Sequence, residues 1–136
     1  MIPFAERAKI QLLEFGDHGH VKLKIPFKGN ENHVGTMYAG SLWSLAEFAG
    51  LPFVLSAFGG TEILVKFLPV VAQFDIKYFK PVKCDIYVTI KKTLDEVENA
   101  ENALCMKGKA KVVLDGELVS ADGTVYGKTQ GVYILI

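Results

Sequence analysis

Glu47 is the one formally charged residue between Glu31 and Glu62, and it lies inside an apolar run that extends from Met37 to Phe58. An ionised carboxylate is costly to bury, so it must be paired with a cation, protonated, or held at a cleft with a raised pKa. A raised carboxylate pKa suits general-acid or general-base catalysis near neutral pH. A structural ion pair with a distant Lys or Arg, or an exposed position, is an equally open interpretation of Glu47.

The whole chain has the composition of an ordinary globular protein. It has 136 residues, of which 50% are hydrophobic and 22% are charged, and this length predicts a single domain over residues 1–136. Fifteen basic residues balance fifteen acidic residues, which argues against a nucleic-acid-binding protein. Cys84 and Cys105 lack a C-x-x-C spacing, so buried free thiols in a reducing compartment are expected.

A cytoplasmic location is expected. The first fifteen residues contain scattered charges and lack the uninterrupted apolar core and cleavage site of a signal peptide. The run over residues 37–58 is long enough to raise the question of a membrane span. However, Glu47, Pro52 and several glycines interrupt it, and no Lys or Arg closely flanks it. A buried central helix, without a membrane partner, explains this run better.

The first part of the chain predicts a strand between two helices. Apolar residues at helical spacing after Pro3 predict a short amphipathic helix, and a strand with one buried face is predicted over residues 21–27. A polar loop follows over residues 29–33, and the long helix is expected to begin near Tyr38. Pro52 has no backbone N–H, so it should kink this helix or end its first part near Leu51. The apolar residues whose spacing predicts the first helix are Phe4, Ala8, Leu12 and Phe15.

The second part of the chain is mostly strand-like. Alternating apolar and polar residues predict strands over residues 74–78, 84–91, 106–114 and from Val119 to the end. Residues 62–71 are expected to lead into the sheet, with an interruption at Pro69. The acidic segment 95–102 is interpreted as a solvated turn, Asp115-Gly116 as a hairpin turn and Asp122-Gly123 as a bulge. The fold class expected is α+β, with one long helix wrapped by a curved antiparallel sheet.

The segment from Asn32 to Glu47 resembles the signature of hotdog-fold acyl-CoA thioesterases of the phenylacetyl-CoA thioesterase type. In that family an Asn, a Gly-Thr pair, a His-Gly-Gly at the helix start and an Asp or Glu on the helix occur in this order. Here Asn32, Gly35, Thr36, Gly40 and Glu47 fall in register without a gap. The resemblance spans roughly residues 18–135 and implies a hotdog fold, although its specific part is confined to these sixteen residues.

The resemblance also implies roles for individual residues. The backbone amide of Ala39, at the helix N-terminus, would stabilise a developing oxyanion on a thioester carbonyl, and Glu47 would act as general base or nucleophile. Asn32 would orient the water or the thioester. The implied substrate is an acyl-CoA or acyl-carrier thioester, hydrolysed without a metal or redox cofactor. In the family the site lies at a dimer interface, so a homodimer or homotetramer is expected.

The helix start departs from the family pattern, because Tyr38-Ala39 stands where the family has His-Gly. Tyr38 could replace the imidazole as a donor, or it could be a core or lid residue. Ala39 keeps the amide but adds a methyl group. These departures favour the alternative of a non-enzymatic module that binds an acyl thioester.

Four residues are expected to bind the substrate. This set contains Gly40 with Tyr38, then Trp43, one turn before Glu47, which either shields the carboxylate from water or packs in the core. The last member is Lys80, which either contacts a CoA phosphate or is an ordinary solvated lysine.

The three histidines suggest two other kinds of chemistry. His33 and Glu47 have the spacing of the catalytic pair in hotdog-fold acyl-carrier-protein dehydratases, but the motifs around that family's His are missing here. A loop His that caps the following helix is the alternative. His18 and His20 would share one strand face, a weak indication of a metal site compared with a surface pair.

Overall fold

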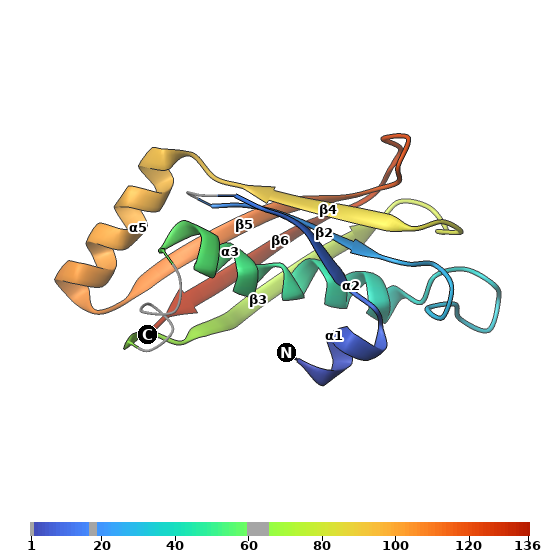
Figure 1. Ribbon diagram of the computed structural model, residues 1–136, viewed down its shortest axis with the longest axis horizontal. Helices are drawn as coiled ribbons and strands as arrows, with labels where there is room; N and C mark the ends of the chain where they lie inside the picture. The colour runs from blue at the N-terminus through green and yellow to red at the C-terminus, as the bar shows by residue number, and fades with distance from the viewer. Residues whose placement is uncertain (1, 17–18, 60–65) are drawn as a thin grey trace.

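In the described part of the chain, six strands form one antiparallel sheet, and the central helical segment packs across one face of it (Figure 1). The computed structural model describes residues 2–16, 19–59 and 66–136. The elements, in chain order, are α1 (Pro3–Arg7), β1 (Gln11–Phe15), β2 (His20–Ile25), α2 (Ala39–Phe48), α3 (Gly50–Ala57), β3 (Pro69–Tyr78), β4 (Ile86–Lys91), α5 (Leu94–Lys107), β5 (Ala110–Val119) and β6 (Val125–Leu135).

The strand order in the sheet is β1-β2-β4-β5-β6-β3, so β1 and β3 are its two edges. Every neighbouring pair is antiparallel. Although β3 is the first described strand after α3 in sequence, it pairs with the last strand, β6. The predicted fold class is confirmed: this is a hotdog fold, in which α2 and α3 lie against the curved sheet.

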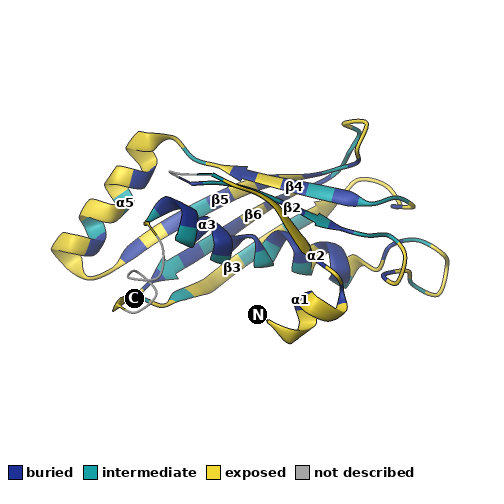
Figure 2. Cartoon of the chain, in the orientation of Figure 1, coloured by how far each residue is buried: buried dark blue, intermediate teal, exposed yellow. Residues whose placement is uncertain are grey.

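The core lies between the sheet and these two helices. The burial pattern of β2 alternates, with Val21, Leu23 and Ile25 fully buried and the lysines between them half-buried. Leu45 and Phe53 supply the largest buried side chains of the helices. Figure 2 shows that burial concentrates along the middle strands and the helices, whereas β1, β3 and most of α5 are exposed. Period-two alternation in the strands therefore gives the sheet its apolar inner face.

The central helix is interrupted, as Pro52 predicts. α2 ends at Phe48, Ala49 lies between the helices, and α3 begins at Gly50. The break precedes the proline because the missing N–H would have bonded to the carbonyl four residues earlier, that of Phe48. No helix among the described residues is long and apolar enough to cross a membrane.

The N-terminal helix is much shorter than predicted, and the expectation for Leu12 and Phe15 is wrong. α1 ends at Arg7, and Lys9 adopts a positive φ of 60° that turns the chain. Leu12 and Phe15 then belong to β1, an edge strand whose residues are all exposed. Because every residue of β1 is exposed, the strand does not require its apolar residues to alternate with polar ones. Leu12 and Phe15 can therefore lie three residues apart in a strand.

The predicted acidic turn over residues 95–102 is wrong, because this segment belongs to helix α5. Thr93 and Glu96 form a capping box, in which each side chain accepts a hydrogen bond from the other residue's backbone N–H. Gly108 ends the helix with a φ of 68°. Val97 and Leu104 form its buried stripe. Cys105 lies on the exposed side, so the prediction of a buried thiol is also wrong there.

The turn between the last two strands lies later than predicted. Asp115 and Gly116 continue β5, where they pair with Gln130 and Thr129 of β6. A Cβ at Gly116 would lie 2.8 Å from the Thr129 hydroxyl, so close side-chain packing explains this glycine better than a turn does. The turn instead contains Gly123, with a φ of 89°, where a bulge was predicted. The strand predicted from Met106 begins at Ala110, after α5.

Candidate active site

Glu47 lies in the last turn of α2 and is half-buried. Burial raises the pKa of its carboxyl above the ordinary value of 4.5. Within the described part of the chain, no Lys, Arg or His lies within ion-pair distance of this carboxylate. The ion-pair interpretation therefore has no support among these residues. A partly desolvated, unpaired carboxylate is suited to accept a proton near neutral pH.

Aromatic side chains gather around Trp43, on the face of α2 that carries Glu47. Trp43 precedes it by one helical turn and meets Phe74 of β3 edge to face, with ring centroids 5.2 Å apart. Gly131 of β6 leaves room between two rings: a Cβ there would lie 2.6 Å from Tyr133 Cε2 and 2.9 Å from Phe74 Cδ2. Trp43 is still 37% exposed. Trp43 therefore connects the α2 face that carries Glu47 with β3 and remains partly open to solvent.

The N-terminus of α2 presents backbone donors. The amide of Tyr38 donates to the Asn30 carbonyl at 2.8 Å, but no acceptor within the described residues is recorded for the next two amides, those of Ala39 and Gly40. Unpaired N–H groups and the helix dipole favour negative charge at such a terminus. The expected oxyanion donor, Ala39, is the first residue of α2.

Tyr38 lies over this first turn, and Gly40 makes room for it. A Cβ at position 40 would lie 2.4 Å from Tyr38 Cε2. Tyr38 is 56% exposed, which excludes the core interpretation for the isolated chain. The Tyr78 hydroxyl donates to the Ala39 carbonyl at 2.9 Å, so β3 is tied to the helix start. The expected substrate-binding residues Tyr38 and Gly40 are thus adjacent to the Ala39 amide.

Asn32 is engaged within its own loop. Its Oδ1 accepts hydrogen bonds from the amides of Val34 (3.0 Å) and Thr36 (3.1 Å), and its Nδ2 donates to the Thr36 hydroxyl at 2.8 Å. His33 is exposed on the same turn. The structure records no contact of either side chain with Glu47. Asn32 therefore shapes the loop before the helix, and no contact connects His33 with Glu47.

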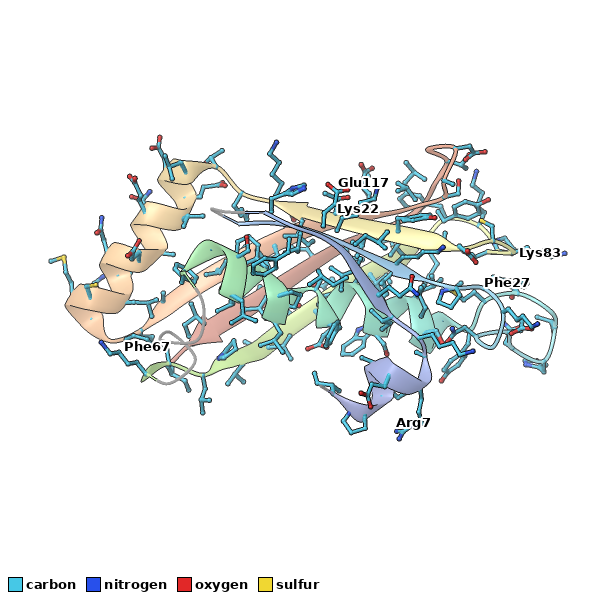
Figure 3. All side chains as sticks on the ribbon, in the orientation of Figure 1. Arg7, Lys22, Phe27, Phe67, Lys83 and Glu117 are labelled. Atoms are coloured by element: carbon cyan, nitrogen blue, oxygen red, sulfur yellow. The ribbon has the colours of Figure 1, made fainter. Side chains whose placement is uncertain are left out.

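Lys80 lies on the exposed loop after β3, with its Nζ 5.2 Å from the centroid of the Tyr126 ring. This loop lies at the end of the molecule where α2 begins, because the Met37 amide donates to the Val82 carbonyl at 2.8 Å. Figure 3 shows Lys83 of the loop at that same end, near Phe27. Lys80 is thus placed beside the helix start and away from the Glu47 end of α2.

Ala39 and Glu47 lie more than two helical turns apart along α2. Eight residues separate them along α2, which is about 12 Å of helix rise. A base, a water and a carbonyl carbon span about two hydrogen-bond lengths, roughly 6 Å. One chain therefore presents these two candidate groups at separate places.

Other parts of the structure do not form a competing site around Glu47. A cavity of about 310 Å³ between α3, α5 and β5 and a hollow of about 900 Å³ on the outer face of the sheet are lined by other residues. In the described chain no three His, Cys, Asp or Glu residues are placed to hold a metal ion. His20 instead pairs with Glu14, with Nε2 3.2 Å from Oε1, and His18 lies outside the described residues.

The sequence model of the family described as "Putative thioesterase (yiiD_Cterm)" matches residues 1–136. The chain belongs to this family. The resemblance to hotdog-fold thioesterases that Asn32–Glu47 indicated is thereby confirmed. None of the functionally curated proteins matches the chain.

Solved structures show the same fold. A Pseudomonas aeruginosa protein of unknown function, described as a "Probable Thioesterase", is 31% identical over 98% of this chain and 87% of that chain, with a TM-score of 0.88. A "putative thioesterase" from Shewanella oneidensis is 27% identical over 98% and 88% of the two chains, with a TM-score of 0.73. A Haemophilus influenzae thioesterase, 12% identical over 98% and 82% with a TM-score of 0.70, shares the fold.

Two residues at the site were missed in the sequence. Tyr78 and Tyr133 contact α2 through their hydroxyl groups. Tyr133 carried a signal, since it is a polar aromatic residue on the same strand face as Leu135. That signal became specific only when the strand pairing showed what Tyr133 faces.

Proposed function

We propose that this member of the family hydrolyses an acyl-CoA or acyl-carrier thioester in a site shared by two chains. Family membership supports thioester hydrolysis as the reaction class. The observation that carries the residue assignment is the half-buried Glu47 carboxylate, which has no recorded cation partner among the described residues. The unpaired amides of Ala39 and Gly40 supply the complementary electrophilic group.

In the general-base route, Glu47 accepts a proton from water while the water oxygen bonds to the thioester carbonyl carbon. Negative charge then develops on the carbonyl oxygen, where the amide of Ala39 from the second chain donates a hydrogen bond. The C–S bond breaks as the carbonyl re-forms, and the proton held by Glu47 passes to the thiolate. The products are a carboxylic acid and a free thiol.

In the nucleophilic route, a Glu47 oxygen bonds to the carbonyl carbon and the thiolate leaves, which gives a mixed anhydride that water hydrolyses. Repeated turnover in H₂¹⁸O tests for an anhydride that water opens at the Glu47 carbonyl. Isotope enters the Glu47 carboxylate when water attacks the enzyme side of an anhydride. It stays out of the protein in the general-base route, and mass spectrometry of the peptide that contains Glu47 reads the result.

The second chain should bind along β3. Trp43 of α2 packs against Phe74 of this strand, and Tyr78 ties the start of α2 to the same strand. Paired β3 edges would bring Glu47 of one chain toward the helix start of the other, because antiparallel pairing reverses the direction of the second copy. Tyr38 and Lys80, beside that helix start, are proposed to contact the thiol carrier, and Lys80 would meet its phosphate groups.

A non-enzymatic acyl-thioester-binding module is the second candidate function. It is favoured by the Ala39 methyl group and by the exposed Tyr38 ring, which narrows the approach to the helix start. The two functions make opposite predictions for product formation. A binding module would hold acyl-CoA without releasing CoA.

The test is thiol release from a panel of acetyl-, hexanoyl-, palmitoyl- and benzoyl-CoA, read with a thiol-reactive dye. We expect turnover of at least one member at a rate well above the no-protein control. Saturable binding of these acyl-CoAs with no thiol release would establish the binding module instead. The Lys80→Ala variant should raise KM for acyl-CoA but have little effect on an acyl thioester of a short thiol that lacks phosphate.

A further inference from the structure

Tyr133 lies on the inner face of β6, almost completely buried, and reaches across to the end of α2. It is 4% exposed, and in the sheet it pairs with Val71 of β3 and Val112 of β5. Its hydroxyl donates a 2.7 Å hydrogen bond to the backbone carbonyl of Glu47, which is 86 residues away in the sequence. A buried phenol thus has its one polar atom on the backbone of the candidate base.

Two glycines hold this ring in place. A Cβ at Gly50 would lie 2.3 Å from Tyr133 Cε1 and 2.5 Å from Cζ, and a Cβ at Gly131 would lie 2.6 Å from Cε2. Any side chain at either position would displace the ring. The ring therefore fits a slot made by one glycine from the helical segment and one from β6.

The hydrogen bond falls where the helix needs support. α2 ends one residue after Glu47, and Pro52 cannot donate to the carbonyl of Phe48. The backbone of this last turn is therefore held by fewer helical bonds than the middle of the helix. Burial, followed by the charge of Glu47, raises the pKa of the Tyr133 phenol, which keeps its proton available for donation at working pH.

We infer that Tyr133 is a positioning residue for Glu47: by donating to the Glu47 carbonyl at the helix break, it fixes the last turn of α2 and so the direction of the carboxylate. This inference rests on the proposed function. In this role the hydroxyl acts through the Glu47 backbone and needs no contact with the substrate. Its effect is expected on the chemical step, because a misplacement of about 1 Å in a catalytic group lowers turnover strongly and can leave ground-state binding unchanged.

The test compares Tyr133→Phe with Ser56→Ala on the fastest acyl-CoA of the panel. Tyr133→Phe removes one hydroxyl and keeps the ring. Ser56 is a matched control because it is buried on α3 and its hydroxyl accepts hydrogen bonds from the backbone amides of Gly19 and His20, both at 3.1 Å. We expect kcat of Tyr133→Phe to fall about ten- to a hundredfold with KM within about twofold, while Ser56→Ala melts at a lower temperature with unchanged kcat.

Gly50→Ala provides a second variant, since it keeps the hydroxyl but displaces the ring, and it should reproduce the loss in kcat at unchanged KM. If Tyr133→Phe and Gly50→Ala both turn over at the wild-type rate while Glu47→Gln is inactive, Tyr133 has only a structural role and the proposed function stands. If Glu47→Gln is fully active, the proposed function fails and the inference fails with it.

Discussion

The hydroxyl of Tyr78 donates a 2.9 Å hydrogen bond to the carbonyl of Ala39, so the edge strand β3 is fixed to the first residue of α2. Tyr133 makes the equivalent contact from β6 to Glu47 at the other end of the same helix. Strands β3 and β6 pair along their whole length. The two candidate catalytic groups are therefore set at a fixed separation by neighbouring strands, and in the proposed function a second chain completes the site.

Substitution of Ala39 tests the oxyanion donor. Ala39 is the first helical residue, a position that accepts proline well, and Tyr38 before it has the extended ψ of 130° that a proline requires. Ala39→Pro should therefore fold, yet lose about a hundredfold or more in kcat because the amide is gone. Ala39→Gly keeps the amide and removes the methyl, so it should retain or exceed the wild-type rate. A folded Ala39→Pro protein with the wild-type kcat would show that the donor lies elsewhere.

Self-association through β3 is the next expectation. β3 is an edge strand with exposed apolar side chains, and such an edge favours pairing with another chain. Val71→Lys places a charge on it, and should shift the protein to monomer and reduce hydrolysis together. Leu13→Lys makes the same change on the other edge, β1, and should leave both unchanged. Sedimentation that finds wild-type monomer alone at micromolar concentration would contradict this prediction.

A shared site predicts complementation between two inactive variants. In a mixed dimer of Glu47→Gln and Ala39→Pro, one site carries both defects and the other carries none. Random mixing at equal amounts should restore about a quarter of the wild-type activity, since half of the dimers are mixed and each of these has one intact site of two. Refolding the two variants together, with each refolded alone as control, measures this. If mixing restores no activity, the two groups do not act together in a site shared by two chains.

The raised pKa of Glu47 also predicts how stability depends on pH. The folded protein retains this proton at pH values where the unfolded chain, with a pKa near 4.5, has lost it. The contribution of Glu47 to stability must therefore fall as the pH rises from about 4.5 through the folded pKa.

Glu47→Gln lacks this dependence, so its stability relative to the wild type should increase over the same interval and then level off. Glu14, Asp85, Glu96 and Asp122 have lowered pKa values and act in the opposite direction, but they are present in both proteins and cancel in the difference. Urea unfolding at a series of pH values checks the difference. If the stability of the wild type rises relative to that of Glu47→Gln as the pH rises, the prediction is wrong.

Local patterns in the sequence were sufficient for the central helix, its break near Pro52 and most of the strands. They failed where helix capping or strand pairing outweighed the local composition. The acidic run at 95–102 suggested solvent, but the capping box of Thr93 and Glu96 and the buried stripe of Val97 and Leu104 make it a helix. Asp115-Gly116 has the composition of a turn, but pairing with β6 keeps it in a strand.

The site was predictable to the extent that it lies on one continuous segment. Ala39, Gly40, Trp43 and Glu47 share a helix, so their relation follows from helical geometry. Tyr133 could not be assigned in this way, because its contact with Glu47 depends on which strand crosses beneath the helix break. The reason for glycine at positions 50 and 131 is the space needed by the Tyr133 ring, which only the three-dimensional structure shows.

The most direct test of the account is hydrolysis by Glu47→Gln, measured on the same preparation as its thermal melt. We expect acyl-CoA binding to be nearly intact, the fold to be retained or stabilised because a buried charge is removed, and kcat to fall by about two to four orders of magnitude. A structural carboxylate paired with a cation would instead lose stability on this change, with activity reduced only in proportion to folded protein. A folded Glu47→Gln protein that hydrolyses acyl-CoA at the wild-type rate would contradict the central claim that Glu47 performs the chemistry.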